Sequence, residues 1–151
     1  IQAGASGLGL AAIQLAKAFG AKVMTSVGSP EKAEAVRLLG ADWVLERHRD
    51  DPAAAFEAHP VDIALDCVGG EVLGSCIGEL SPGGRWILIS TLGGEFARIS
   101  LRPILKRGIR LIGSTLRSRS TEMKTRILHE LEEKVWPKFG SKEIRPVVVL
   151  Q

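Results

Sequence analysis

Apolar residues along this chain follow two alternating patterns. Runs of consecutive apolar residues, typical of parallel strands buried on both faces, alternate with stretches in which apolar residues recur every three or four positions, as on one face of a helix. The runs predict strands at residues 1–3, 22–27, 43–45, 61–68, 85–91 and 109–114. The periodic stretches predict helices at residues 8–19, 30–40, 51–59, 71–80, 101–106 and 121–135.

Residues at the helix ends support these boundaries. Ser29 is suited to cap a helix that begins at Pro30 and ends near Gly40, because its hydroxyl can accept a free backbone N–H and proline is tolerated at the first helical position. Pro137 is expected to end the longest helix, since proline lacks the N–H that a helix interior needs. That helix is expected to turn an apolar face to the core, made of Ile127, Leu128, Leu131 and Val135.

A glycine-rich turn, Gly4-Ala5-Ser6-Gly7-Leu8-Gly9, lies between the first predicted strand and the first predicted helix. Such a turn lets the backbone pass close to a ligand and directs free N–H groups and the positive end of the helix dipole toward it, which suits the pyrophosphate of a dinucleotide. Gly4 is expected to make the tight turn, Gly7 to let a phosphate approach, and Gly9 to let the helix pack on the strand. Ser6 replaces the second glycine of the usual pattern, and its hydroxyl is expected to meet an anion.

Strand–helix alternation with nearly continuous apolar strands is typical of a parallel sheet that helices cover on both faces. Six strands joined by short crossovers predict an α/β, doubly wound (Rossmann) six-stranded parallel sheet with helices on both faces and strand order 3-2-1-4-5-6. Residues 1–135 are expected to form this dinucleotide-binding domain, with its first strand truncated. Residues 136–151 are expected to begin a return segment to another domain of a longer protein, because they end in an apolar, strand-like run.

Composition excludes several classes of protein. The 151 residues are 45% hydrophobic and 25% charged, as in ordinary globular domains, and no apolar run approaches the roughly 20 residues of a membrane span. The net charge of +3 is mild and the charges are interspersed, so that nucleic-acid binding is not implied. The cluster of Arg107, Arg110, Arg117 and Arg119 is interpreted as a solvated face or, alternatively, as a surface that binds an acidic partner.

The residues that usually carry metal or nucleophilic chemistry are not grouped in the sequence. Cys67 and Cys76 have neither zinc-ligand nor redox spacing, so that buried, reduced thiols in a cytoplasmic protein are expected. The three histidines stand alone, and no nucleophile elbow is present. No metal site and no catalytic side chain are expected in this chain.

Several spaced motifs resemble those of the medium-chain dehydrogenase/reductase superfamily, and within it the zinc-free quinone oxidoreductase branch. The motifs are the glycine-rich turn, Leu39-Gly40-Ala41, Asp66-Cys67-Val68-Gly69-Gly70, Gly84-Arg85-Trp86-Ile87 and Leu116-Arg117-Ser118-Arg119. The last of them looks most like the p53-inducible quinone oxidoreductases and their bacterial relatives. The resemblance implies a preceding catalytic domain, NADPH as the cofactor, and hydride transfer to a quinone or another α,β-unsaturated carbonyl compound.

Gly28 indicates the choice of cofactor. NAD enzymes usually carry Asp or Glu at this place to bind the ribose 2′-OH, whereas a small residue leaves room for the 2′-phosphate of NADPH, which Ser29 and Lys32 can approach. The resemblance likewise places Gly28 and Lys32 on this phosphate. Alternatively, Lys32 is a solvated residue of the first helical turn.

Arg47 stands where relatives commonly have tyrosine, and this chain has no tyrosine. Its guanidinium can stack on the adenine or pair with the 2′-phosphate, or it can lie on the surface beside Glu46. Ser6, Gly7 and Leu8 are expected at the pyrophosphate.

Two further loops follow the fourth and fifth predicted strands at the carboxyl edge of the sheet, where such folds bind ligands. The resemblance places Val68 and Gly69 beside the ribose, and Ser90, Thr91 and Leu92 beside the nicotinamide ribose and ring. Alternatively, the glycines of these loops serve only tight turns. Asp66 is expected to be a satisfied structural carboxylate.

We therefore expect the NADPH-binding domain of a quinone oxidoreductase, whose chemistry the cofactor carries. Two alternatives stay open: the cofactor domain of an enoyl reductase or alcohol dehydrogenase of the same superfamily, and a non-enzymatic dinucleotide-sensing or interaction module. The expected partners are a quinone-like small molecule and a second copy of the chain. The copies would join through residues 109–114, an apolar strand at the sheet edge.

Overall fold

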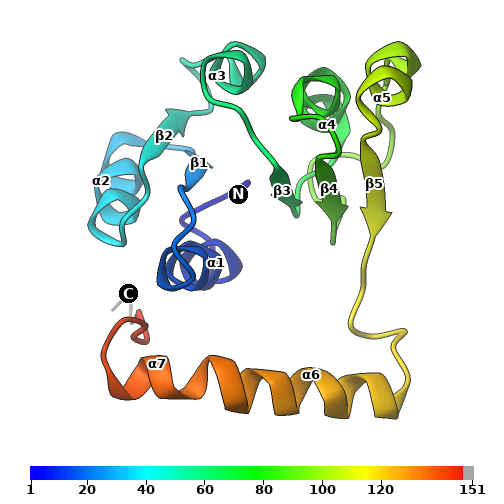
Figure 1. Cartoon of the computed structure of the whole chain (residues 1–151). Helices are drawn as coiled ribbons and strands as arrows, with labels where there is room; N and C mark the ends of the chain where they lie inside the picture. The colour runs from blue at the N-terminus through cyan, green and yellow to red at the C-terminus, as the bar shows by residue number, and fades with distance from the viewer. Residues whose placement is uncertain (148–151) are drawn as a thin grey trace.

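The computed structural model describes residues 1–147, which fold into parallel strands flanked by helices (Figure 1). The strands are β1 (Met24–Val27), β2 (Trp43–Glu46), β3 (Ile63–Asp66), β4 (Arg85–Leu88) and β5 (Arg110–Gly113). The helices are α1 (Gly7–Ala18), α2 (Pro30–Leu38), α3 (Pro52–Ala58), α4 (Gly70–Cys76), the 3-10 turn η1 (Ile77–Glu79), α5 (Leu101–Arg107), α6 (Thr121–Lys134) and α7 (Trp136–Gly140).

The described residues form five strands in two parallel groups, so that the expectation of six strands in one sheet is wrong. β1 pairs with β2, and β3, β4 and β5 pair in that order. Residues 1–3 do not form a strand, because so few residues before the turn make only scattered bonds to their neighbours. The Gln2 N–H donates to the Leu65 carbonyl at 3.0 Å, and the Ser26 N–H donates to the Ile1 carbonyl at 3.3 Å. Residues 1–4 therefore lie between β1 and β3, where the expected order places the first strand.

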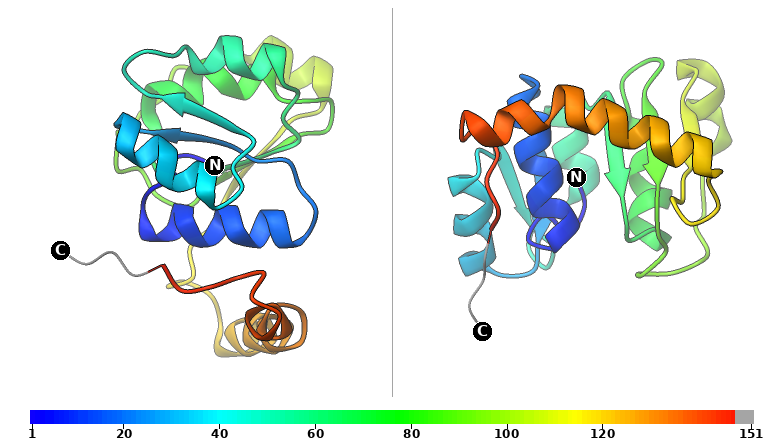
Figure 2. Two further views of the ribbon diagram at one scale, coloured as in Figure 1. Left: turned by 90° about the vertical axis from the view of Figure 1, so that its left-hand side faces the viewer. Right: turned by 90° about the horizontal axis from the view of Figure 1, so that it is seen from below.

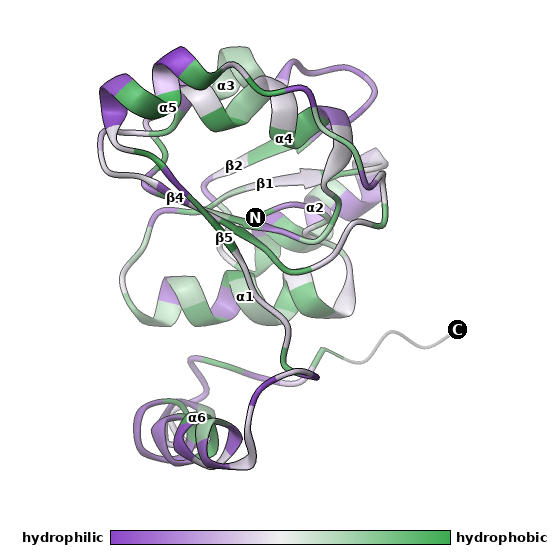
Figure 3. Cartoon of the chain, turned by 90° about the vertical axis from the view of Figure 1, so that its right-hand side faces the viewer, coloured by the Kyte–Doolittle hydropathy of each residue, from purple (hydrophilic) through white to green (hydrophobic). Residues whose placement is uncertain are grey.

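Helices cover both sides of the strands. α3, α4 and α5 lie on one side and α1 lies on the other (Figures 1 and 3). Under α3 to α5, the fully buried Trp86 packs with Leu73, Ile77 and Leu80. A second cluster joins α1 and α2 to the first two strands and contains Ile13, Val27, Ala33 and Val36. The two clusters confirm the expected α/β layering around parallel strands.

The boundaries of α2 follow from its capping residues. The Ser29 hydroxyl accepts a hydrogen bond from the Lys32 N–H at 3.4 Å, Pro30 is the first helical residue, and Gly40 follows the helix with a φ of +96°. A left-handed residue after a helix is most easily a glycine. The predicted start and end of this helix are confirmed.

The longest helix, α6, differs from expectation at its inner face and at its end. Ile127, Leu128 and Leu131 are 43%, 64% and 37% exposed, because α6 lies beyond α1 and away from the strands (Figure 2). Pro137 does not end α6, which stops at Lys134. Pro137 instead lies in the first turn of α7, where a missing N–H costs no helical hydrogen bond.

After α7 the chain returns to α1. The Gln14 Nε2 donates to the Arg145 carbonyl at 3.1 Å, and the Arg145 N–H donates to Gln14 Oε1 at 3.0 Å. Ile144 is buried beside this contact. The expected strand-like run over 146–151 lies mostly outside the described residues. The expected end of the dinucleotide-binding domain at residue 135 therefore stays a prediction. No helix among the described residues combines the length and apolarity needed to cross a bilayer.

Candidate cofactor site

The glycine-rich turn begins α1, as predicted. Ser6 is the N-cap, and its Oγ accepts a hydrogen bond from the Gly9 N–H at 3.0 Å. The first turn of α1 carries no acidic side chain. The partial positive charge of this helix end is therefore not compensated by the helix itself, which favours an anion in front of it.

The three glycines of the turn meet different surroundings. A Cβ on Gly9 would lie 2.6 Å from the backbone of Gly4, and a Cβ on Gly4 would collide with the side chain of Thr25. These two glycines allow α1 to pack closely on the segment that lies between β1 and β3. A Cβ on Gly7 would meet no atom within 4 Å, so that this side of the turn is open. Approach of a phosphate there stays a prediction.

A cavity of about 250 Å³ lies beside the turn and gathers residues from four parts of the chain. Of the predicted cofactor residues, Ser6, Gly28, Lys32, Arg47 and Val68 line it. The register of β1 and β2 explains part of this grouping, because Val27 pairs with Glu46 and the next residues, Gly28 and Arg47, lie side by side at the carboxyl ends of the two strands.

The lining of this cavity carries positive charge without negative charge. Lys32 and Arg47 are its charged residues, and it contains no Asp, Glu, His or Cys. The ion pairs found among residues 1–147 involve other side chains, and Glu46 pairs with Arg49 at 3.4 Å instead of with Arg47. Such a site favours an anionic ligand.

Other predicted residues do not line the cavity. The Ser29 hydroxyl caps α2. The cavity lining also lacks six other predicted residues, of which Gly69 is buried, Ser90 is half-buried and the rest are exposed: Gly7, Leu8, Gly69, Ser90, Thr91 and Leu92. Their roles toward a cofactor stay predictions.

The loop predicted beside the ribose and the loop predicted beside the nicotinamide are joined to each other. The Gly93 N–H donates to the Val68 carbonyl at 2.7 Å, and Gly69 and Gly94 form a parallel bridge. Gly69 and Gly70 have φ values of +69° and +63°, a conformation that favours glycine. The loops after β3 and β4 therefore form one backbone-linked unit at the edge of the site.

Sequence reasoning missed several residues that line the cavity. They are Gln2, Ala3, Ala5, Ser26, Val27 and Val72. Ser26 had a usable signal, because it is a polar residue near the carboxyl end of an apolar strand. Its Oγ accepts a hydrogen bond from the Ala3 N–H at 3.3 Å. Val72 gave no signal, since an apolar residue in α4 resembles any core residue.

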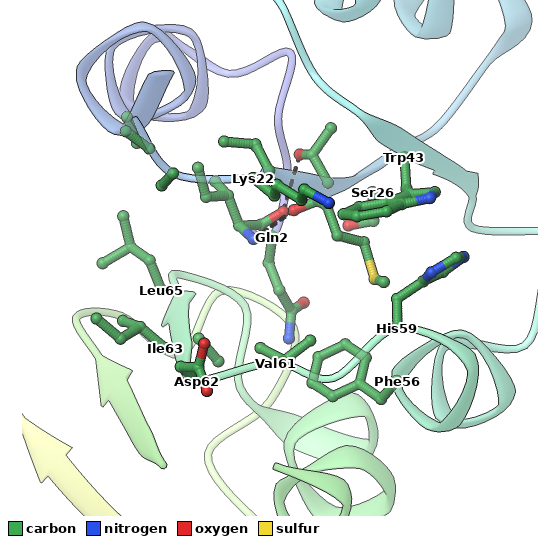
Figure 4. Close-up of a pocket in the computed structure, with 18 of the residues that line it drawn as sticks. Gln2, Lys22, Ser26, Trp43, Phe56, His59, Val61, Asp62, Ile63 and Leu65 are labelled. Carbon is green, nitrogen blue, oxygen red and sulfur yellow. Dashed lines mark hydrogen bonds between the residues drawn. The ribbon is translucent and has the colours of Figure 1, made fainter. Parts of the chain in front are cut away.

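A larger cavity of about 620 Å³ lies between β1 and β3 (Figure 4). Its lining is mostly apolar and includes none of the predicted cofactor residues. The Gln2 side chain points into it, and its buried Nε2 has no hydrogen-bond partner among the described residues. Within its lining, the rings of Trp43 and His59 stack at 4.3 Å between centroids. Burial beside this cavity lowers the pKa of the Ile1 amino group to about 6.

The chain is similar to known oxidoreductases and to polyketide synthases. A family model described as zinc-binding dehydrogenase matches residues 7–133. The crystal structure of a quinone oxidoreductase from Thermus thermophilus, also solved in complex with NADPH, is 29% identical with a TM-score of 0.81. The match covers 98% of this chain and 47% of that chain.

Two curated proteins extend the comparison. Quinone oxidoreductase-like protein 2 of Mus musculus is 30% identical over 118 residues, which are 75% of this chain and 34% of that protein. The spectinabilin polyketide synthase system protein NorB of Streptomyces orinoci is 41% identical over 93 residues, which are 58% of this chain and 4% of that protein. The chain spans less than half the length of each of these relatives. It belongs to the zinc-binding dehydrogenase family of the medium-chain dehydrogenase/reductase superfamily.

Proposed function

We propose that this chain is the NADPH-binding domain of an oxidoreductase that transfers hydride from the nicotinamide to a quinone or another α,β-unsaturated carbonyl compound. One observation carries the proposal: the small cavity joins the glycine-rich turn to Gly28, Lys32 and Arg47, with no acidic side chain in its lining. The Thermus thermophilus relative, solved in complex with NADPH, supports the same cofactor.

The adenosine end of NADPH is expected at the carboxyl ends of β1 and β2. A carboxylate at position 28 would repel a 2′-phosphate, whereas glycine leaves space for it beside two cations. Lys32 and Arg47 are free of intramolecular ion pairs among residues 1–147, so that both can bind the phosphate. The pyrophosphate is expected at the turn of Ser6, Gly7 and Leu8.

The nicotinamide end is expected beside the joined loops after β3 and β4, near Val68, Gly69 and residues 90–92. When bound, NADPH supplies the hydride, and the side chains of this chain bind, orient and shield it. The family description names zinc, but no three His, Cys, Asp or Glu side chains come together to hold a metal ion within residues 1–147. No step of the proposed reaction therefore uses a metal ligand of this chain.

For the domain organisation, we propose that residues 1–135 form the cofactor domain and that residues 136–151 begin a return to a catalytic domain. The larger cavity fits an upstream continuation of the first strand. An extended segment in this cavity would run between β1 and β3 and cover apolar side chains such as Met24 and Leu65.

Two further proposals concern partners and location. Leu111 and Ile112 form the hydrophobic middle of the edge strand β5, between Arg110 and Gly113, and are 48% and 38% exposed (Figure 3). Pairing of this edge with the same edge of a second copy would give a two-fold dimer, which light scattering of concentrated protein would detect and a persistent monomer would contradict.

The free, buried thiols of Cys67 and Cys76 support a reducing location such as the cytoplasm.

One alternative function has specific support. Several relatives are polyketide synthases, which favours an enoyl reductase that would reduce an α,β-unsaturated acyl thioester. Turnover assays of the longer protein with NADPH, comparing a quinone panel with enoyl thioesters, separate the two. Quinone turnover supports the proposal, preferred thioester turnover supports the enoyl reductase, and no turnover with either supports the non-enzymatic module.

The 151 residues alone are expected to bind NADPH weakly and to be inactive, because the far side of the nicotinamide requires the other domain. Calorimetry should detect binding and a quinone reductase assay should detect no turnover. Robust turnover by these residues alone would contradict the proposed domain organisation.

A further inference from the structure

Asp66 places a fully buried carboxyl group at the end of β3. Its Oδ1 accepts hydrogen bonds from the backbone N–H groups of Val68 at 2.7 Å and Gly69 at 2.9 Å. Its Oδ2 accepts a hydrogen bond from the Trp86 Nε1 at 2.8 Å. Asp66 and Trp86 are both 0% exposed. Both carboxyl oxygens are thus engaged, and two of the three donors belong to the loop that follows β3.

That loop borders the candidate cofactor site. Val68 lines the small cavity, and Gly69 and Gly70 continue the chain in a left-handed conformation. The backbone at this point turns the N–H groups of residues 68 and 69 inward to Asp66. The Val68 carbonyl instead meets the loop after β4, where it accepts a hydrogen bond from the Gly93 N–H at 2.7 Å.

The second loop depends on the first through a close contact. A Cβ on Gly93 would lie 2.5 Å from the Val68 Cγ1 and 3.2 Å from its carbonyl oxygen, so that the two loops touch without space between them. A shift of Val68 would therefore move residues 91–94 as well. The chain of contacts runs from Trp86 through Asp66 and Val68 to Gly93.

We propose that Asp66 is a positioning residue for the nicotinamide half of the bound cofactor. It fixes Val68 and Gly69, and through Val68 the loop of residues 91–94, in the arrangement that receives the ribose and the ring. A buried carboxyl group costs free energy that an apolar side chain of similar size would not. Here that cost is offset by backbone N–H groups at the border of the site. This inference rests on the proposed NADPH function.

The test compares two ligands, of which only one carries the nicotinamide half of the cofactor. NADPH spans the whole site, whereas 2′,5′-ADP occupies only the adenosine and 2′-phosphate end. In the 151-residue chain, Asp66→Asn leaves one acceptor oxygen and turns an NH₂ group toward an N–H donor. We expect the affinity for NADPH to fall about tenfold, and the affinity for 2′,5′-ADP to stay within about twofold.

Two further variants secure the interpretation. Asp62→Asn, on the same segment but exposed, is the matched control and should leave both affinities unchanged. Gly93→Ala adds a methyl group against Val68 without touching Asp66, and should also weaken NADPH selectively. It carries the test if Asp66→Asn fails to fold by circular dichroism.

The outcomes separate the two proposals. Equal loss of both ligands, or no loss of NADPH, in the folded variant overturns the positioning role, since a general effect on stability would not select one half of the cofactor. Failure of the unsubstituted chain to bind either NADPH or 2′,5′-ADP overturns the proposed function, and the positioning role with it.

Discussion

The guanidinium of Arg47 lies against the backbone of Gly28, so that a Cβ on Gly28 would stand 3.2 Å from Arg47 Nη2. The two residues follow Val27 and Glu46, which pair in the register of β1 and β2. The parallel pairing of two strands thus brings a cation to the point where the sequence lacks a carboxylate.

Gly28→Asp should invert the preference for NADPH over NADH. The introduced carboxylate would repel the 2′-phosphate, pair with the nearby Arg47, and accept hydrogen bonds from the ribose hydroxyls of NADH. The fold should tolerate the change, because the new Cβ meets only the end of a flexible side chain. Calorimetric titration of the variant with each cofactor measures the inversion, and an unchanged preference would contradict the role of this position.

Arg47→Ala should weaken NADPH binding by about tenfold and leave NADH binding nearly unchanged. The 2′-phosphate loses a charge-assisted hydrogen bond, worth about 1.5–3 kcal/mol at full strength and less in a partly exposed site. The matched control is Arg49→Ala, since Arg49 lies two residues further on and pairs with Glu46 outside the cavity. Equal effects of both variants would mean that only general electrostatic attraction acts. Lys32→Ala should resemble Arg47→Ala.

The structure shows why Arg47 could not be assigned from the sequence. Arg47 lines the cavity, whereas Arg49, two positions further on, lies on the surface. In the sequence, Glu46 could pair with either arginine. The strand register resolves this, because it places Arg47 beside Gly28 and leaves Glu46 to Arg49. By contrast, the glycine turn and the Ser29 cap depend on local geometry, and their positions were predicted correctly.

Gly7→Ala and Gly9→Ala should separate binding from folding within one turn. A methyl group on Gly9 would collide with the backbone of Ala3 and Gly4, so that this variant should be destabilised by at least about 2 kcal/mol in urea unfolding. A methyl group on Gly7 meets no protein atom within 4 Å. Gly7→Ala should therefore keep its stability and lose NADPH affinity. A Gly7→Ala variant with unchanged affinity would place the pyrophosphate elsewhere.

Asp42 should stabilise the fold in a pH-dependent way. Its carboxylate accepts hydrogen bonds from Lys17 at 2.8 Å and from the Val23 N–H at 2.6 Å, and these hold the pKa of Asp42 below its usual value. Because the folded-state pKa is lowered, the stabilisation is present above the unfolded pKa of about 3.9 and is lost as the pH falls through the folded value.

Asp42→Ala should accordingly cost about 1–2 kcal/mol at pH 7, mainly through the unpaired Val23 N–H. Lys17→Ala should cost less than about 1 kcal/mol, since it removes only a partly exposed ion pair. Urea unfolding from pH 7 down to about pH 3 gives the comparison. A difference between Asp42→Ala and the unsubstituted chain that persists undiminished at low pH would contradict the ionic role of Asp42.

The remaining differences between sequence and structure arise from tertiary arrangement. The apolar positions of α6 were assigned to the core by their spacing alone, but spacing does not reveal that the helix lies beyond α1. Pro137 lies at a helix boundary whether it ends one helix or begins the next, and the sequence does not show that α7 begins there. The pairing of the loops at Val68 and Gly93 depends on backbone contacts across two strands, which no local pattern encodes.

The ratio of the dissociation constants for NADPH and NADH, measured by calorimetry on the unsubstituted chain, tests the central claim most directly. The space at Gly28 and the two cations, Lys32 and Arg47, predict that NADPH binds at least about tenfold more tightly, with the advantage shrinking as salt is added. Equal constants, or tighter binding of NADH, would contradict the assignment of this cavity to the 2′-phosphate and with it the proposed cofactor.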